Sequence, residues 1–148
     1  MGTVFNISAY GDEQTATTVL VEGKVVVSQK NKLFGYTEKN LEPGQGCFYS
    51  SSTYTSDIHE VRLCEFTSWK DGLLIFNEKP LSIVVNRVEK YYNKKINIDG
   101  AALPNTLISG KLVLSENIDE VMHYLVKTLE TRFDKREDGT YSINSSHN

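Results

Sequence analysis

The sequence predicts an α+β fold, with a β-rich first part over residues 1–66 and a helix-containing second part over residues 67–148. Two sets of apolar residues in the second part lie 37 positions apart and share one helical spacing, i, i+3, i+4, i+7, i+11. β-branched residues and turn signals dominate the first part, which is typical of strands. The two sets are Leu81, Val84, Val85, Val88, Tyr92 and Ile96, and Ile118, Val121, Met122, Leu125, Leu129 and Phe133.

The β-rich part reads as a series of short strands joined by turns. Glu22-Gly23 separates two β-branched runs, residues 15–21 and 24–28, and predicts a tight hairpin in which glycine supplies a positive φ. The polar residues 29–40 predict a loop, and residues 50–55 have the composition of a linker. The remaining expected elements are a strand at 4–10, a turn at 11–13, a turn at 41–46, and strands at 47–49 and 60–66.

The second part reads as two copies of strand–helix–strand. Pro80 is expected in the first turn of the first helix, which runs to about Asn93, and Ser115 is expected to cap the second helix. Asp138-Gly139 predicts a closing hairpin. One sheet covering both helices would form a two-layer βαβ-βαβ(β) domain. The expected strands are 72–76, 96–98, 107–114, 132–136 and 140–143, followed by a polar tail at 145–148.

Composition and charge exclude several classes of function. The net charge of −3, with scattered Lys and Arg, provides no electrostatic footprint for nucleic acid. No apolar run reaches the roughly 18–20 residues that cross a bilayer, and no secretory signal is present. The chain begins as if within a strand, so we expect a fragment of a longer protein. Cys47 and Cys64 are expected to be small buried side chains, although a disulfide between strands stays open.

The sequence contains no pattern typical of an enzyme or a cofactor site. Asp57, His59 and Glu60 stand close together, but alternation along a strand places Asp57 and His59 on one face and Glu60 on the other, and no second ligand cluster is present in the sequence. Neither cysteine has a histidine nearby in sequence, and no Gly-x-Ser-x-Gly elbow exists. We therefore expect no catalytic residue, no cofactor and no metal.

Several segments of both parts resemble one known family. The segments are residues 2–10, 19–25 and 41–45 in the first part, and residues 69–76 with Pro80-Leu81 in the second. The first group resembles the later part of the FecR-type β domain of anti-sigma regulators, particularly members of the Bacteroidetes type. The second group resembles the C-terminal domain of the same family. That domain is similar to the STN domain, the small βαβ repeat of secretins and of the N-terminus of TonB-dependent transporters. The resemblance implies a partial β domain at 1–66 and an STN-like signalling domain at 67–148.

The resemblance also implies a function. Such proteins have a cytoplasmic anti-sigma segment and one membrane helix, both absent from this chain, and a periplasmic sensor. The sensor receives a signal from the N-terminal signalling domain of a TonB-dependent transporter, whose substrate is an iron chelate or a glycan, and controls an ECF sigma factor. Two alternatives remain: an assembly module of the secretin N-domain type, and a small glycan-binding β protein. Some relatives cleave themselves at a motif that matches Gly2-Thr3.

The last strand is a candidate contact with the transporter. It follows a tight turn and precedes a polar tail, so we expect a free sheet edge that pairs with a partner strand. The alternative, that this strand lies inside the sheet, is nearly as well supported. The contact residues would be Thr140, Tyr141, Ser142 and Ile143.

Overall fold

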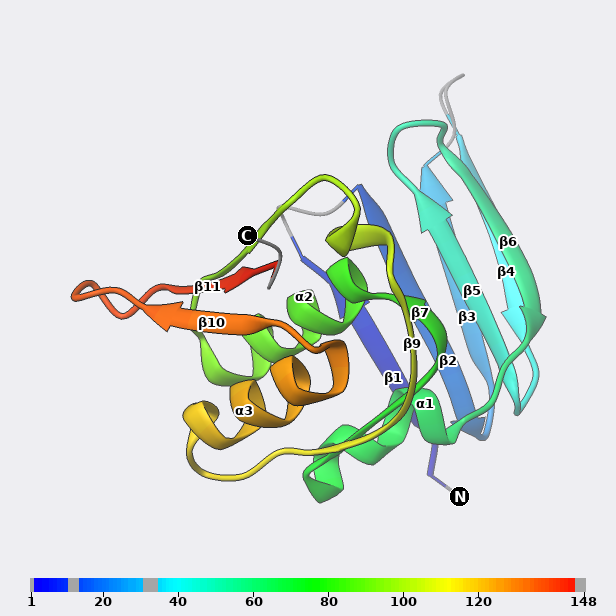
Figure 1. The fold of residues 1–148 in the computed structure, drawn as a ribbon. Coiled ribbons are helices and arrows are strands. Elements are labelled where there is room, and N and C mark those ends of the chain that lie inside the picture. Colours follow the sequence, from blue (N-terminus) through cyan, green and yellow to red (C-terminus); the bar gives the residue numbers. More distant parts are fainter. Residues whose placement is uncertain (1, 11–13, 31–34, 146–148) are drawn as a thin grey trace. The chain divides into compact units, whose positions relative to one another are not determined.

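The computed structural model describes residues 2–10, 14–30 and 35–145, and the chain divides into two compact units, residues 1–67 and 68–148. Mixed sheets and α-helices make up the described part, so the predicted α+β class is confirmed (Figure 1). None of the described helices combines the length and the apolar character that a membrane-spanning helix needs. The turn predicted at residues 11–13 and residues 146–148 of the predicted tail lie outside the described residues.

Unit 1 is built almost entirely from strands. Four strands form an antiparallel sheet in the order β1-β2-β5-β6, and β3 pairs with β4 in a second, two-stranded sheet. Leu20, Leu41 and Cys47 are buried together between these strands. The elements are β1 (Val4–Ala9), β2 (Thr15–Glu22), β3 (Val25–Lys30), β4 (Tyr36–Leu41), β5 (Gln45–Ser50), β6 (Thr55–Glu60) and the short helix α1 (Cys64–Thr67).

The hairpin predicted around Glu22-Gly23 is wrong in its pairing. Gly23 does adopt a positive φ of 91°. However, both edges of β2 are occupied, one by β1 and the other by β5, so β3 cannot pair with it. The turn therefore carries the chain from one sheet to the other, where β3 pairs with β4.

Three further expectations for unit 1 are corrected by the observed strand pairing and by a short helix. Residues 36–40, expected in a loop, lie in β4 because β3 supplies their hydrogen-bond partners. The expected linker at residues 50–55 is the tight connection of the β5–β6 hairpin. The strand expected at 60–66 is wrong, because β6 ends at Glu60 and the chain then turns into α1, where the N–H of Thr67 donates to the Leu63 carbonyl at 3.0 Å.

Unit 2 confirms the predicted repeat. Its two long helices begin 37 positions apart, and each ends at a left-handed residue, Asn93 at φ 50° and Glu130 at φ 52°. The order strand–helix–strand is therefore followed twice. The elements are η1 (Ser68–Asp71), β7 (Leu73–Pro80), α2 (Leu81–Tyr92), β8 (Ile96–Asp99), η2 (Leu103–Asn105), β9 (Leu107–Val113), α3 (Ile118–Leu129), β10 (Arg132–Lys135) and β11 (Tyr141–Asn144).

The strands of unit 2 form two sheets, so the predicted single sheet and two-layer arrangement are wrong. β7 pairs with β9, whereas β11 pairs with β10 on one side and with β8 on the other. Helix α2 contacts β7, β9 and β8, and α3 contacts β9 and β10, so the helices lie between the two sheets (Figure 1). One apolar core includes buried residues from both helices and both sheets, such as Leu74, Val88, Met122 and Ile143.

Two helix caps differ from the sequence interpretation. Asn117, rather than Ser115, caps α3, because its Oδ1 accepts a hydrogen bond from the Asp119 N–H at 2.9 Å. The Ser115 hydroxyl instead donates to the Asn117 carbonyl at 2.7 Å and supports the cap from outside the helix. Pro80 occupies the position before the first turn of α2 rather than the first turn itself. Serine and asparagine both commonly cap helices, so the sequence alone does not distinguish Ser115 from Asn117 as the cap of α3. The local backbone geometry places Asn117 at that position.

We predict that Val88→Asp destabilises the protein by about 3 kcal/mol or more, because it places an unpaired charge in the core between the sheets. Val88 is fully buried, whereas Ile83 on the same helix is 45% exposed. Ile83→Asp is therefore the matched control and should change the free energy of unfolding by much less. Urea denaturation followed by circular dichroism measures both. Equal losses in the two variants would contradict the described core.

Candidate functional site

The last strand does not offer the free edge that its sequence predicts. β11 is the central strand of its sheet: Tyr141 pairs with Lys135 of β10 and, in parallel, with Ile96 of β8. Tyr141, Ser142 and Ile143 are buried, at 4% exposure or less. Their backbone groups are already used, so the free edge expected at residues 140–143 is wrong, and the partner contact that rested on it stays a prediction. The paired residues of β8 and β11 lie more than 40 positions apart in the sequence, so no local sequence pattern predicts this pairing.

An open strand edge lies instead on β9. Leu114 donates its N–H to the Gly72 carbonyl at 2.8 Å, and the Leu81 N–H donates to the Thr106 carbonyl at the other end of the pair. Alternate residues of a strand direct their backbone groups to opposite sides. The even-numbered residues of β9 therefore pair with β7, and Ser109, Lys111 and Val113 direct theirs outward. Among the described residues, no strand pairs with that outward edge.

A groove accompanies the open edge. It has a volume of about 460 Å³ and lies between β9 and α3 within unit 2. Its floor is apolar, with Phe76, Ile108 and Leu112 from the sheet and Leu125 from the helix. Glu120, Tyr124 and Thr128 form its rim along α3.

The groove exists because the sheet is narrower than the layer of helices beneath it. Neighbouring strands are about 4.8 Å apart, whereas packed helices are about 8–10 Å apart. Helix α2 contacts both strands of the β7–β9 sheet, whereas α3 contacts β9 at its edge. The far flank of α3 therefore extends beyond β9, and no strand of the described ranges lies above it.

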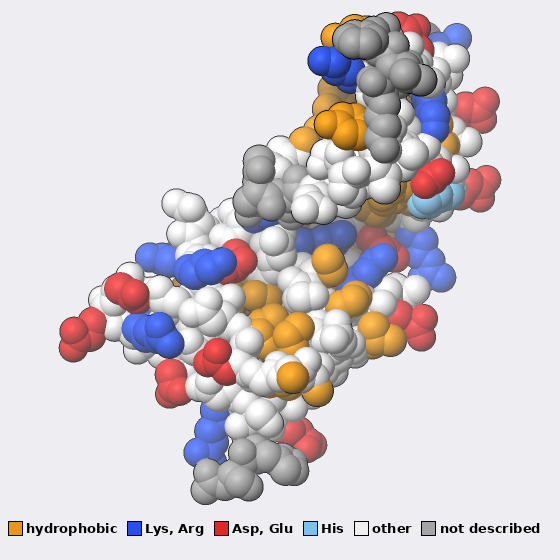
Figure 2. Space-filling view, turned by 90° about the horizontal axis from the view of Figure 1, so that it is seen from above, with side chains coloured by type: hydrophobic (Ala, Val, Ile, Leu, Met, Phe, Trp, Pro, Cys, Tyr) orange, Lys and Arg blue, Asp and Glu red, His pale blue; other side chains and the backbone are white. Residues whose placement is uncertain are grey.

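Large apolar side chains reach the surface around this edge. Leu107 is 61% exposed, and Val113 and Tyr124 are each 64% exposed. Figure 2 shows one face of the molecule on which hydrophobic side chains lie among interspersed acidic and basic ones. An exposed apolar rim beside unpaired backbone groups is typical of a protein-binding surface.

The sequence contains one signal for this edge. Val113 and Leu107 flank a strand whose centre is Gly110-Lys111, and a lysine in the middle of a strand is typical of a sheet edge. Gly110 adopts a φ of 145° where β7 is interrupted by a bulge. There the backbone N–H of Glu78 donates to the Ser109 hydroxyl at 2.8 Å.

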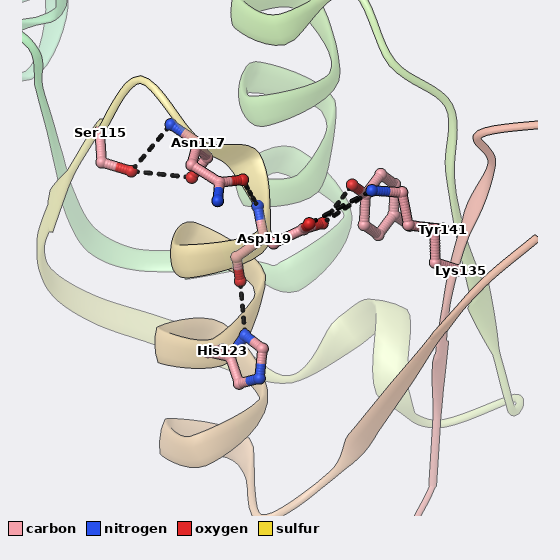
Figure 3. A network of polar contacts seen from close by, with 6 residues as sticks. All are labelled: Ser115, Asn117, Asp119, His123, Lys135 and Tyr141. Atoms are coloured by element: carbon pink, nitrogen blue, oxygen red, sulfur yellow. Dashed lines mark hydrogen bonds and ion pairs between the residues drawn. The ribbon is translucent and has the colours of Figure 1, made fainter.

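A polar network ties the start of α3 to the β10–β11 hairpin (Figure 3). The Asp119 carboxylate accepts hydrogen bonds from the Tyr141 hydroxyl and from Lys135 Nζ, the latter at 3.2 Å. These bonds lower the pKa of Asp119, with the Tyr141 hydroxyl as the largest cause. His123 contacts the Asp119 carbonyl through Nδ1 at 2.7 Å and packs edge-on against the Phe133 ring. The network fixes two elements together, and its groups are engaged with one another.

The other candidate residues predicted from sequence are not brought together. Gly2 and Thr3 are exposed and precede β1. Cys47 is buried and Cys64 is exposed, and both are free thiols. The ring of His59 stacks on Phe48 with centroids 4.5 Å apart. In the described ranges, no cluster of three or more His, Cys, Asp or Glu side chains is arranged to hold a metal ion.

Comparison with known proteins identifies one family and two related folds. The family model described as "FecR, C-terminal" matches residues 73–143. No curated protein matches the chain. Two crystal structures, each of a "putative anti-sigma factor" from Parabacteroides distasonis ATCC 8503, are similar in fold at 21% identity. The structure at 1.65 Å resolution has a TM-score of 0.75 and the one at 2.50 Å has a TM-score of 0.72. The matches cover 99% and 97% of this chain but only 66% and 64% of those chains.

We predict that Tyr141→Phe raises the pKa of Asp119 toward its ordinary value, because the hydroxyl that stabilises the carboxylate is removed. Because folding lowers this pKa, the network stabilises the fold above the carboxyl's unfolded pKa, and that contribution is lost as pH falls through the lowered value. NMR titration of the Asp119 carboxyl carbon measures the shift. Asp138, whose pKa is lowered by hydrogen bonds from Thr140 and not by Tyr141, is the internal control and should titrate alike in both proteins. An unchanged pKa for Asp119 would contradict the network.

Proposed function

Because residues 73–143 match the family model described as "FecR, C-terminal", we propose that this chain is part of the sensor region of a FecR-like anti-sigma regulator. The family match over nearly all of unit 2 is the observation that carries the proposal. The fold shared with two structures from Parabacteroides distasonis supports it. The proposed role is regulatory and operates through binding rather than catalysis.

In this role the region would lie in the periplasm, as part of a single-pass inner-membrane protein. The membrane helix and the cytoplasmic segment that binds an ECF sigma factor would belong to parts of that protein beyond this chain. Unit 1 would be the later part of a FecR-type β domain. Exposed apolar side chains on β1, namely Val4 at 47%, Phe5 at 50% and Ile7 at 58%, are consistent with further packing against that strand. Self-cleavage between Gly2 and Thr3 stays a prediction.

In this proposal the signal comes from an outer-membrane partner. The N-terminal signalling domain of a TonB-dependent transporter would bind unit 2, and occupancy of the sensor would be relayed across the membrane to the sigma factor. The open β9 edge and its groove provide unit 2 with a surface that suits a protein partner. A protein surface of this kind needs no cofactor.

We predict that the purified chain binds the signalling domain of the transporter encoded beside its own gene. Isothermal titration calorimetry should give saturable binding with one signalling domain per chain. The signalling domain of a transporter from an unrelated gene cluster is the control and should bind at least about tenfold more weakly, since specificity is a difference of affinities. Absence of heat, together with unchanged elution of the mixture in size-exclusion chromatography, would contradict the proposed function. A stable ring of the chain alone would instead favour an assembly module.

A further inference from the structure

We propose that unit 2 binds its partner by strand addition: an extended segment of the partner joins the β7–β9 sheet at the outward edge of β9 and covers the exposed flank of α3. This inference rests on the proposed function, because it assigns a contact to the same relay. The proposed occupant of the edge is a partner strand with apolar residues at alternate positions. The juxtaposition of unpaired backbone groups with an apolar groove supports that occupant.

The backbone of β9 selects for an extended partner. Ser109, Lys111 and Val113 each direct an N–H and a carbonyl to the open side, because the residues between them pair with β7. These donors and acceptors recur every second residue, at about 6.6–6.8 Å, which is the repeat of another β-strand. A helix satisfies its own backbone groups internally and could not pair with this row. Only a strand satisfies the edge.

The groove selects the side chains of that strand. A strand beside β9 directs every second side chain toward α3. Those side chains would enter a groove of about 460 Å³ whose floor includes Ile108, Leu112 and Leu125. Apolar residues at these positions would be removed from water, and the Tyr124 ring, 64% exposed, would gain a neighbour. Inward-facing charged residues would be unfavourable except near the Glu120 end of the rim.

The opposite face of the added strand would be in solvent beside Lys111. Lys111 lies at the centre of the outward-facing row, and opposite charges on neighbouring strands attract. The partner strand is therefore expected to combine apolar residues on one face with an acidic residue on the other. This pattern can be sought in the sequence of the signalling domain before any experiment.

A second copy of this chain would not fit the same edge through its own β9. At first view the edge is self-complementary, since antiparallel pairing about Gly110 would place Leu107 opposite Val113 of the copy. However, α3 extends beyond β9 on the side where the copy would dock. Two strands about 4.8 Å apart would bring two α3 helices, which need about 8–10 Å, into the same space. A single strand avoids this conflict.

Two pairs of variants of the full chain test the inference. Lys111→Pro removes the outward N–H at the centre of the edge, and proline is tolerated where a strand's N–H faces away from its own sheet. Lys111→Ala keeps that N–H and removes only the side chain. Thr128→Trp fills the groove from the exposed surface of α3, whereas Lys127→Trp places the same ring at a neighbouring exposed position outside the groove lining. Circular dichroism and thermal unfolding establish that each variant is folded.

The measurement is the Kd for the purified signalling domain by calorimetry. We expect Lys111→Pro and Thr128→Trp each to weaken binding by about tenfold or more. Lys111→Ala should weaken binding clearly less than Lys111→Pro, because it loses only the exposed charge pair. Lys127→Trp should stay within about threefold of the unmodified chain. Equal affinities in all folded variants would overturn strand addition at β9 but leave the proposed function intact. Absence of binding by the unmodified chain would overturn both. A concentration-dependent dimer in light scattering that Lys111→Pro disperses would also overturn the inference, because it would identify a second copy as the occupant.

Discussion

The arrangement of unit 2 depends on a mismatch of widths between helices and strands. Two helices packed side by side need roughly twice the width of a two-stranded sheet. The three-stranded sheet β10-β11-β8 and the two-stranded sheet β7-β9 enclose the same helix pair from opposite sides. The narrower sheet leaves the outer flank of α3 uncovered, and this produces both the groove and the open edge of β9.

The two-sheet enclosure also explains how the repeat becomes one core. Each helix contacts strands of both sheets, so apolar residues around much of its circumference are buried. A helix covered by one sheet would bury a narrower stripe. The Asp119 network then joins the start of α3 to the β10–β11 hairpin and fixes the side of the unit away from the groove.

The two long helices could be predicted from sequence, whereas the pairing of the strands could not. The spacing of Leu81, Val88, Ile118 and Leu125 determined both helices. By contrast, the pairing of β2 with β5, or of β11 with β8, joins segments far apart in the chain. A turn such as Glu22-Gly23 specifies a change of direction but not which strand lies alongside afterwards.

The same distinction applies to the candidate site. Residues 140–143 follow a turn and precede a polar tail, so their sequence predicts an edge strand. β11 is central in the structure because β8, which lies far earlier in the chain, pairs with its other edge. Lys111 carried a real edge signal, but the groove beside it depends on where α3 lies relative to β9. The bond between Tyr141 and Asp119 likewise depends on packing. Whether a strand lies at the edge or in the centre of a sheet depends on all the strands of that sheet, and the sequence of one strand predicts it only weakly.

The most direct test of an open β9 edge is amide hydrogen exchange of the chain, alone and with the signalling domain bound. Outward N–H groups have no internal partner strand among the described residues, so the amides of Lys111 and Val113 should exchange quickly in the free chain, whereas those of Gly110 and Leu112 should be protected by β7. Binding should slow exchange at Lys111 and Val113 by at least about tenfold, since a partner strand would accept their hydrogen bonds. Equal exchange rates at these two amides in the free and bound chain would contradict the account.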